Sequence, residues 1–292
     1  MPEERSPVTL SIVIVNWNTR DHLLGALESI YSAPPAFPFE VIVVDNASHD
    51  GSAEAVAGQR PQVELIANRE NAGYAQGNNQ AMQLACGAYV LLLNPDVTLP
   101  AGALDRAVAF MEERTDAGAL GVLQRFPNGE IQRSLRGFPT PQAVLWELIG
   151  LSRLFPGSRF FSAYRMNWFH YDRVAEVDQP MGTFLLIRRK ALDAVGPLDE
   201  AFPIFFNEVD WLLRSRRAGW KTYFTPDVEI VHYGGASTEQ VSREMAWESR
   251  RGLLRFYKKH YGGVAYLPLR LIIAAGSWLD AAIKARTRKR AD

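Results

Sequence analysis

Polar side chains follow three of the buried strands that the N-terminal part of the chain predicts. They are Asn16 and Asn18 after the first strand, Asp45 and Asn46 after the second, and Asn94 and Asp96 after the fourth. In an open α/β sheet, ligands bind outside the carboxyl ends of the strands. Because parallel strands place those ends on one edge, we expect these side chains to converge. Each strand end alone also fits a turn or a helix N-cap, but their coincidence favours a polar ligand.

The elements that must position these residues alternate along the chain. Apolar runs at 8–15, 39–44, 63–67 and 89–93 are separated by amphipathic helical segments. Runs that are apolar on both faces suit parallel strands covered by helices on each side, and their spacing is that of successive βαβ units. The sequence therefore predicts an α/β fold with a mostly parallel central sheet flanked by helices.

The middle of the chain, 126–178, is rich in Pro, Gly, Arg and aromatic residues and has no steady period. It predicts irregular structure that crosses an edge of the sheet, with one helix at 141–151. A compact pattern resumes afterwards. Its expected elements are a strand and a helix within 181–196, a helix at 207–218, short strands at 221–224 and 228–232, and C-terminal helices at 237–262 and 267–290.

The bulk composition limits the function. The 292 residues carry 32 basic and 32 acidic side chains, so no global field favours nucleic acid as a partner. The sequence shows no signal-peptide pattern and no apolar window of about 20 residues, which predicts a cytoplasmic protein. The single cysteine, Cys86, excludes an internal disulfide and is expected to be a small buried thiol.

Several familiar catalytic motifs are absent. The chain has no G-x-G-x-x-G after its first strand, no G-x-x-x-x-G-K-[ST], no G-x-S-x-G, no H-E-x-x-H and no paired C-x-x-C. What remains is a nucleotide site in which a metal, rather than a glycine-rich loop, neutralises phosphates. Asp96 is suitably placed, because a carboxylate together with water and phosphate oxygens suits Mg²⁺ or Mn²⁺.

Five stretches of the sequence carry a resemblance to a known family. They are "SIVIVNWNTRDHLLGALESI", "VIVVDNASHDGS", "NRENAGYAQGNNQAM", "LLLNPDV" and "MGTFLLIRRKALDAVGPLDEAFPIFFNEVDWLLRSRRAGW". In this order and spacing they resemble family 2 glycosyltransferases of the GT-A fold, especially the bacterial rhamnosyltransferase-like branch. The resemblance covers about residues 8–238. It implies a catalytic domain at 1–238, with 126–178 on the acceptor side, and a C-terminal helical extension at 239–292.

The resemblance implies a nucleotide pocket at the first two strand ends. Asp45 is expected to hydrogen-bond the base, and Asn16, Asn18 and Asn46 are expected to line the pocket for base and ribose. The stretch 71–79 is expected to pack beside the nucleotide. Its binding residues are Asn71, Gly73, Gly77 and Asn78, where the glycines permit close approach, although a helix start with small packing residues is an equal interpretation of Asn78 and Asn79.

The resemblance also implies a metal site. Asp96 matches the last residue of the family's D-x-D motif, and Asn94 stands at its first position, which leaves one carboxylate as the direct ligand. His232 lies in "IVHYGGAST", after a short strand, and resembles the C-terminal histidine that completes the metal or diphosphate site. A lone histidine is more often structural, so that interpretation stays open.

The second acidic cluster, "FNEVDW", supplies the candidate general base. Glu208 is flanked by aromatic residues in the first turn of a predicted helix, where the macrodipole favours the ionised form that a base requires. The family usually has an acidic pair here, and this chain has Asn207 and Glu208. Asn207 followed by Asp210 also fits an N-cap with an N3 acid. Asp210 is therefore either structural or the second candidate base.

The implied reaction is an inverting, single-displacement glycosyl transfer that uses a divalent metal, Mg²⁺ or Mn²⁺. A dTDP- or UDP-sugar is the expected donor, and rhamnose or a related hexose is the expected sugar. The acceptor is a hydroxyl of a glycan or of a polyprenyl-diphosphate-linked sugar in cell-surface polysaccharide synthesis. The alternatives are a sugar nucleotidyltransferase, which would usually carry a Gly-rich basic loop after the first strand, and a non-catalytic carbohydrate- or nucleotide-binding protein.

The C-terminal segment bears on where the acceptor lies. It joins the apolar stretch "LIIAAGSWL" to the basic run "KARTRKR". A basic, Trp-containing helix can lie in a membrane interface and attract anionic lipid, which would place the protein peripherally on the inner face of the membrane. A helix packed on the domain or in a homodimer is the equal alternative.

Overall fold

The computed structural model describes residues 7–234, 242–263 and 266–272. The chain forms two compact units, residues 1–241 and 242–292, here called the N-terminal and C-terminal units. All the sequence-predicted site residues belong to the N-terminal unit.

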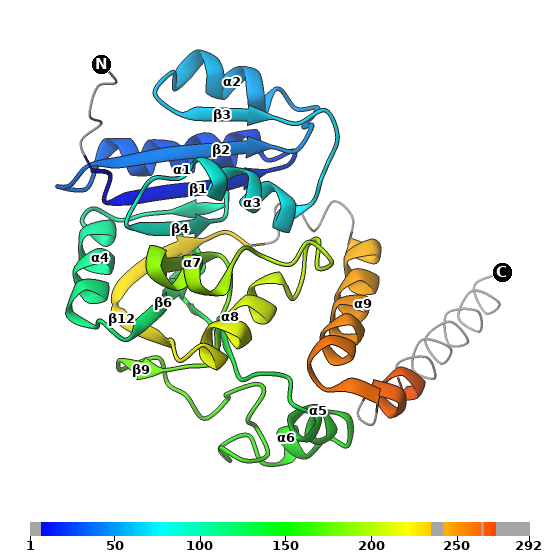
Figure 1. Cartoon of the computed structure of the whole chain (residues 1–292). Helices are drawn as coiled ribbons and strands as arrows, with labels where there is room; N and C mark the ends of the chain where they lie inside the picture. Colours follow the sequence, from blue (N-terminus) through cyan, green and yellow to red (C-terminus); the bar gives the residue numbers. More distant parts are fainter. Residues whose placement is uncertain (1–6, 235–241, 264–265, 273–292) are drawn as a thin grey trace. The chain divides into compact units, whose positions relative to one another are not determined.

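A mixed central sheet organises the N-terminal unit (Figure 1), and its main strand order is β3-β2-β1-β4-β11-β6-β12-β5. β1, β2, β3 and β4 run parallel, β11 runs antiparallel between β4 and β6, and β12 runs parallel to β6. The predicted α/β class with a mostly parallel sheet is confirmed. The strands are β1 Leu10–Asn16, β2 Phe39–Asp45, β3 Glu64–Ala67, β4 Tyr89–Leu93, β5 Val97–Thr98, β6 Ala117–Arg125, β7 Ile131–Gln132, β8 Leu135–Arg136, β9 Ala175–Glu176, β10 Gln179–Pro180, β11 Phe184–Arg188 and β12 Lys221–His232.

Helices cover both faces of this sheet, which explains why β1 and β4 are buried along their whole length. α1, α2 and α4 contribute to one core with alternate residues of β1 and β2, while α3, α7 and α8 lie over the other face (Figure 1). The helices of this unit are α1 Arg20–Ser32, α2 Ser52–Gln59, α3 Tyr74–Leu84, α4 Ala103–Glu113, α5 Pro141–Leu148, α6 Leu151–Leu154, α7 Arg189–Val195 and α8 Asn207–Arg217.

Three local expectations are wrong. The strands expected at 221–224 and 228–232 are one strand, β12, whose register against β6 shifts between Thr225 and Glu229, where Pro226 has no N–H to donate. The helix expected at 141–151 is two helices, separated at Gly150, which adopts a φ of 80°. Cys86 is exposed, because α3 ends at Leu84 and the thiol lies in the turn that follows.

The C-terminal unit begins with α9, Ser242–His260, and residues 266–272 are also helical. Within this unit the rings of Phe256 and His260 pack in a tilted arrangement with centroids 4.6 Å apart. The beginning of the helix expected at 237–262 and most of that expected at 267–290, including the basic run 284–290, lie outside the described residues. No helix among the described residues has both the length and the apolar character needed to cross a membrane.

Candidate active site

The first two strand ends meet as predicted. Asn16 lies opposite Asp45 in the register of β1 and β2, and its Nδ2 donates a hydrogen bond to Asp45 Oδ2 at 2.9 Å. Asp45 Oδ1 accepts from the backbone N–H of Ser48 at 2.8 Å. Asn16 is fully buried, and Thr19 Oγ1 donates to its Oδ1 at 2.6 Å. Asn16 therefore orients the Asp45 carboxylate, and both side chains are buried.

Ser48, which the sequence did not single out, joins the two loops above these strands. Its Oγ accepts the backbone N–H of Asn18 at 2.8 Å and lies 3.2 Å from Asn16 Nδ2, which donates to it. Asn18 adopts a φ of 51° and accepts the N–H of His49 at 2.7 Å through its own Oδ1. These bonds hold the loops after β1 and β2 in one arrangement.

Asn46 and the two glycines of the 71–79 stretch serve close packing inside the protein. Asn46 Nδ2 donates to the carbonyl of Gly73 at 3.1 Å. A Cβ on Gly77 would lie 2.9 Å from a methyl of Val15, and one on Gly73, whose φ is 85°, would lie 3.0 Å from the Pro203 carbonyl oxygen. Asn71 is exposed and only closes the turn, by accepting from Gly73 N–H.

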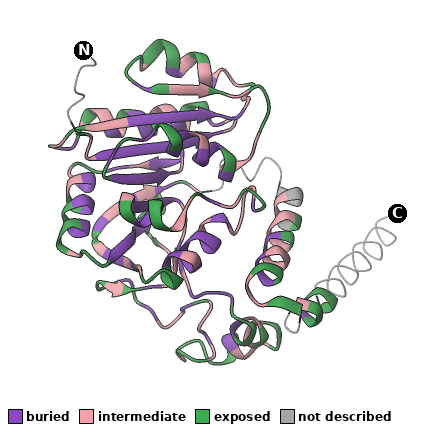
Figure 2. Cartoon of the chain, in the orientation of Figure 1, coloured by how far each residue is buried: buried purple, intermediate pink, exposed green. Residues whose placement is uncertain are grey.

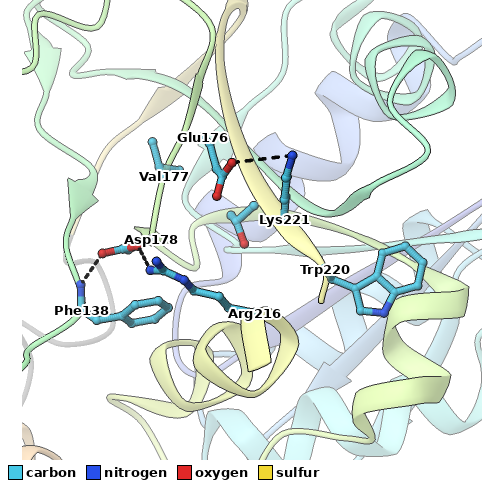
Figure 3. Close-up of a pocket in the computed structure, with 8 residues that line it drawn as sticks. Phe138, Glu176, Val177, Asp178, Arg216, Trp220 and Lys221 are labelled. Atoms are coloured by element: carbon cyan, nitrogen blue, oxygen red, sulfur yellow. Dashed lines mark hydrogen bonds and ion pairs between the residues drawn. The ribbon is translucent and has the colours of Figure 1, made fainter. Parts of the chain in front are cut away.

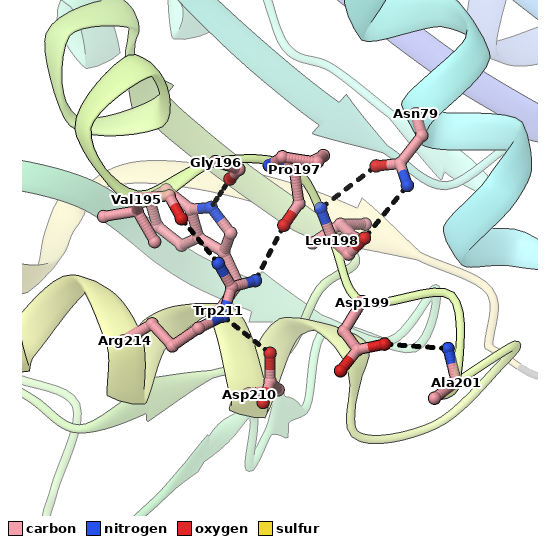
Figure 4. A network of polar contacts seen from close by, with 10 residues as sticks. All are labelled: Asn79, Val195, Gly196, Pro197, Leu198, Asp199, Ala201, Asp210, Trp211 and Arg214. Atoms are coloured by element: carbon pink, nitrogen blue, oxygen red, sulfur yellow. Dashed lines mark hydrogen bonds and ion pairs between the residues drawn. The ribbon is translucent and has the colours of Figure 1, made fainter.

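The equal interpretation of Asn78 and Asn79 as packing residues is supported by their contacts. Asn78 is fully buried and donates to the Tyr74 carbonyl at 2.8 Å within α3. Asn79 pairs with the backbone of Leu198 in both directions, at 2.9 and 3.0 Å, as Figure 4 shows. Asn79 thereby ties α3 to the loop that leads to α8 and to the candidate base.

The fourth strand ends at Leu93, and Asn94, Pro95 and Asp96 form a turn before β5. Asn94 keeps intermediate exposure, and its backbone N–H donates to the Thr183 carbonyl at 2.9 Å. The interpretation of this stretch as a turn is correct. The turn also brings Asp96 beside His232.

Asp96 and His232 lie together although they are far apart in the sequence. β5 pairs antiparallel with the end of β12, so that His232 is opposite Val97, and the backbone N–H of Tyr233 donates to the Asp96 carbonyl at 3.0 Å. His232 Nε2 lies 3.3 Å from Asp96 Oδ1, and both side chains are buried. The two residues predicted from sequence to share a metal site are neighbours.

Gln132 fixes the imidazole of His232 from the other side. Gln132 Oε1 lies 2.7 Å from His232 Nδ1, and an amide oxygen there requires the proton on Nδ1. Nε2 is buried and faces Asp96, and within the described part of the chain no hydrogen bond to it is formed. An imidazole held through Nδ1, with Nε2 turned towards a carboxylate, has the orientation that a metal-binding histidine requires.

These residues fit a divalent ion only as part of a shared shell. The described residues contain no group of three or more His, Cys, Asp or Glu side chains that could hold a metal. Mg²⁺ and Mn²⁺ are commonly held by few protein ligands, with water and substrate phosphates completing the shell. Asp96 and His232 therefore fit an ion that arrives with a diphosphate.

Glu208 lies at the start of α8, against Gly182 in the segment before β11. A Cβ on Gly182 would lie 3.5 Å from Cγ of Glu208. Burial raises the pKa of Glu208 from 4.5 to about 7, and the backbone N–H groups of Glu208 and Val209 oppose this. The expectation that the helix start favours the ionised form is thus outweighed by desolvation, although the residue keeps intermediate exposure.

Tyr74 is a buried residue within reach of the charges of both Glu208 and Asp96. Burial is the main cause that raises the pKa of the Tyr74 phenol, and the charges of Glu208 and Asp96 raise it further. The Tyr74 hydroxyl donates to the Gly182 carbonyl at 3.2 Å. The sequence did not single out Tyr74, Gly182 or Gln132, although Tyr74 and Gly182 lie within the resembling stretches.

The sequence suggested Asn207 as the N-cap of α8 with Asp210 as its N3 acid, and this is wrong. The N-cap is Phe206, with a φ of 71°, and Asn207 is the first helical residue, whose Nδ2 donates to the Ile204 carbonyl. Asp210 is fully buried and accepts from Arg214 Nε at 2.8 Å. The other nitrogens of Arg214 donate to the carbonyls of Val195 and Pro197, both at 2.7 Å (Figure 4).

A small pocket in the same unit lies away from these residues. Its charged side chains bond one another: Asp178 accepts from Arg216 and from the Phe138 N–H, and Lys221 lies 4.0 Å from Glu176 (Figure 3). Lys221 begins β12, at the amino end of the strand, whereas His232 ends it. This pocket therefore lies at the end of the strands opposite to the end that carries His232. It is lined by Phe138, Glu176, Val177, Asp178, Arg216, Trp220, Lys221 and Thr222.

Comparison with known proteins agrees with this geometry. The family model described as "Glycosyl transferase family 2" matches residues 11–196. The chain belongs to glycosyl transferase family 2. It is 30% identical over 244 residues to the N-acetylglucosaminyl-diphospho-decaprenol L-rhamnosyltransferase of Mycobacterium tuberculosis. The alignment covers 78% of this chain and 77% of that protein. The predicted family and its rhamnosyltransferase-like branch are confirmed.

Other relatives of this glycosyltransferase support the family and the fold. The low-salt glycan biosynthesis hexosyltransferase Agl10 of Haloferax volcanii is 25% identical and covers 76% of this chain and 66% of that protein. The solved mannosyltransferase PcManGT of Pyrobaculum calidifontis, in complex with GDP-Man and Mn²⁺, superposes with a TM-score of 0.59 at 18% identity and covers 98% of this chain and 82% of that one. The fold is GT-A, as the sequence predicted.

Proposed function

We propose that this family 2 glycosyltransferase transfers rhamnose or a related hexose, with inversion, from a dTDP- or UDP-sugar to a hydroxyl of a glycan or polyprenyl-diphosphate-linked acceptor. One observation carries the proposal. Asp96 and His232 lie together at the sheet edge that also carries Asp45. The charges of both Asp96 and Glu208 contribute to the raised pKa of the Tyr74 phenol.

The order of the strands suggests how the donor would lie across the sheet. Asp45 ends β2, Asp96 follows β4, and His232 ends β12, and these strands lie in that order across the sheet. The nucleoside would therefore bind at Asp45, with Asn16, Ser48 and Asn18 holding that carboxylate and its loop. The diphosphate would extend along the edge towards Asp96 and His232. Residues 1–238 would form the catalytic domain.

Asp96 and His232 would hold a divalent ion, Mg²⁺ or Mn²⁺. When bound, the ion would neutralise the diphosphate and stabilise the charge that develops on it as the sugar departs. Gln132 keeps His232 Nε2 available, since it occupies Nδ1. Asn94 would line the donor pocket and leave Asp96 as the one carboxylate ligand in this turn.

Glu208 would act as the general base. Its carboxylate would accept the proton of the acceptor hydroxyl as that oxygen attacks the anomeric carbon from the face opposite the departing diphosphate. A pKa near 7 leaves the base form available at neutral pH and still gives it affinity for the proton. Asp210 is less suited, because Arg214 already binds its carboxylate.

The acceptor class is suggested by the mycobacterial relative, whose name describes a decaprenol-linked substrate. A lipid-linked acceptor in this chain's reaction would place the protein at the inner face of the membrane, on the cytoplasmic side.

Calorimetric titration with UDP and dTDP, with and without Mn²⁺, tests the donor site. The proposal predicts metal-dependent binding that Asp96→Asn weakens. Metal-independent binding, or none, would contradict it. A panel of sugar nucleotides assayed for slow hydrolysis would then identify the donor. Formation of a sugar nucleotide from a sugar phosphate would instead support a nucleotidyltransferase.

A further inference from the structure

An exposed apolar surface lies on the segment that follows β8. Leu145 and Leu148 of α5 and Ile149 at its C-cap recur at the i, i+3, i+4 spacing of one helix face. They are exposed to solvent, where a globular helix would bury such a face. Together with Leu154, Phe155 and Phe160 they form what we call the α5–α6 surface. These six residues are between 45% and 68% exposed, and Figure 2 shows the exposed character of α5 and α6.

The α5–α6 surface rests on a framework of aromatic rings. Trp146 packs against Phe160 and Phe161 with centroids 5.7 and 5.5 Å apart, and Phe155 packs against Phe161 at 5.3 Å. The exposed side chains are therefore presented by packed neighbours. Exposed apolar groups of this extent mark protein or membrane contacts.

The charges around this surface indicate which contact it makes. Residues 141–165 carry three arginines and a single acid, Glu147, whose side chain is 15% exposed and bonded to Arg165. Arg153 and Arg159 are exposed among the apolar side chains. A two-fold dimer through this surface would bring the arginines of both copies to the same interface, whereas an anionic lipid surface would neutralise them.

The α5–α6 surface is connected to the candidate base. Glu147 of α5 bonds to Arg165, and the adjacent Tyr164 senses the charge of Glu208, which contributes to its raised pKa after burial and other charges. The Tyr164 carbonyl accepts from Gly137 N–H at 2.9 Å, just after β8. The segment that presents the apolar surface is thus bonded to the chain just after β8 and lies within reach of the charge of Glu208.

We propose that the α5–α6 surface inserts into an anionic membrane and so brings the acceptor side of the catalytic unit to the lipid. The apolar side chains enter the headgroup–acyl boundary and Arg153 and Arg159 contact lipid phosphates. The benefit to catalysis rests on the lipid-linked acceptor of the proposed function, but membrane binding does not.

The test uses the full chain and sedimentation with vesicles of equal parts phosphatidylglycerol and phosphatidylcholine. Salt high enough to screen surface charge keeps the basic run 284–290 from dominating the result. We expect the wild type to bind. The triple variant Leu148→Glu, Ile149→Glu, Leu154→Glu should lower the partition coefficient at least about tenfold, because each side chain loses a favourable transfer to the apolar phase.

Leu84→Glu is the matched control, since Leu84 is an exposed leucine at the end of α3 and should leave binding unchanged. At low salt, Arg153→Glu should weaken binding to the anionic vesicles and not to phosphatidylcholine alone. Wild-type chain that does not sediment, or a triple variant that sediments like wild type, would overturn the proposal.

The oligomeric state and the thermal midpoint distinguish two other occupants of the α5–α6 surface. If a second copy of the chain covers the surface, the triple variant will convert a dimer to a monomer without loss of vesicle binding. If the chain's own C-terminal segment covers it, the triple variant will instead have a lower thermal midpoint. Either result overturns the proposal. Metal-dependent UDP or dTDP binding should be equal in wild type and variant, so that failure of the donor site and failure of the membrane contact are distinguished.

Discussion

At the scale of single residues, Glu208 has the property that a pH profile reports most directly. Its pKa is raised to about 7 by burial, so the base form is populated only as the pH rises through that value. We expect kcat/KM for transfer to increase with pH along a limb with an apparent pKa near 7. The measurement is the pH dependence of sugar transfer at saturating metal.

Glu208→Gln removes the proton acceptor while keeping the size of the side chain. Turnover should fall by about 10²–10⁴-fold, the usual contribution of a positioned base, whereas binding of UDP or dTDP should be retained. Turnover that survives this substitution with an unchanged pH limb would exclude Glu208 as the base.

Gln132 gives a second residue-scale prediction, because it acts only through His232. Gln132→Leu removes the acceptor for Nδ1–H, so the imidazole is free to rotate and to change tautomer. The Mn²⁺ affinity measured in the presence of UDP should fall by about 10–100-fold, as for other partners that orient metal ligands. Gln132→Glu supplies another acceptor oxygen and should restore it. Equal affinity in Gln132→Leu would mean that His232 is not a ligand.

The sequence predicted the residues that occupy strand ends and missed those that meet them through packing. Asn16 and Asp45 were expected together because parallel strands share an edge, and their contact is confirmed. Gln132 belongs to a two-residue strand, β7, in a segment without periodicity. Nothing in its local sequence indicates that β6 would hold β7 near the end of β12.

At the scale of elements, the strands with a continuous apolar run were predictable and β6 was not. Its sequence "AGALGVLQR" contains two glycines and two alanines in the first five residues, so it lacks the bulky, branched residues that mark a buried strand. The small residues are required by their neighbours, since a Cβ on Gly121 would lie 2.3 Å from Pro180 Cβ. Tertiary contacts, rather than local propensity, therefore decide this strand.

Arg214 is the element-scale test of how α8 is held. It joins Asp210 to the carbonyls that end α7 and begin the next loop. Asp210→Asn leaves the guanidinium without its buried counter-ion, and the free energy of unfolding should decrease by about 2–3 kcal/mol, somewhat less than for a fully buried pair because Arg214 is partly exposed. Urea denaturation measures this.

The same variant separates the two acidic residues of α8. If Asp210 is structural, turnover per folded molecule should stay close to wild type below the denaturation midpoint. A variant with wild-type stability and no turnover would instead make Asp210 the base.

At the scale of the whole molecule, the sequence did not predict the exposed apolar face within the N-terminal unit. The pattern of α5 is that of a helix covering a core, and the sequence alone does not show which helices find a sheet to cover. The sheet already carries helices on both faces, and α5 presents its apolar residues to solvent. Burial is decided by the assembled fold.

The raised pKa of Glu208 also predicts how the stability of the N-terminal unit depends on pH. The folded state holds the Glu208 proton up to about pH 7, whereas the unfolded chain releases it near 4.5. Between these values the folded state binds more protons, so this residue's contribution to the free energy of unfolding is complete below about 4.5 and is lost as the pH rises through about 7. Its upper limit is about 3 kcal/mol.

Comparison with Glu208→Gln isolates this contribution, because glutamine does not titrate and every other ionisable group is shared. Without metal or nucleotide, the variant should become progressively more stable relative to wild type as the pH rises from about 5 to about 8. The thermal midpoints of the two proteins, measured across that range, give the difference directly. A constant difference would mean that the Glu208 carboxyl is as well solvated in the folded protein as in the unfolded chain, and that its suitability as a base at neutral pH comes from position alone.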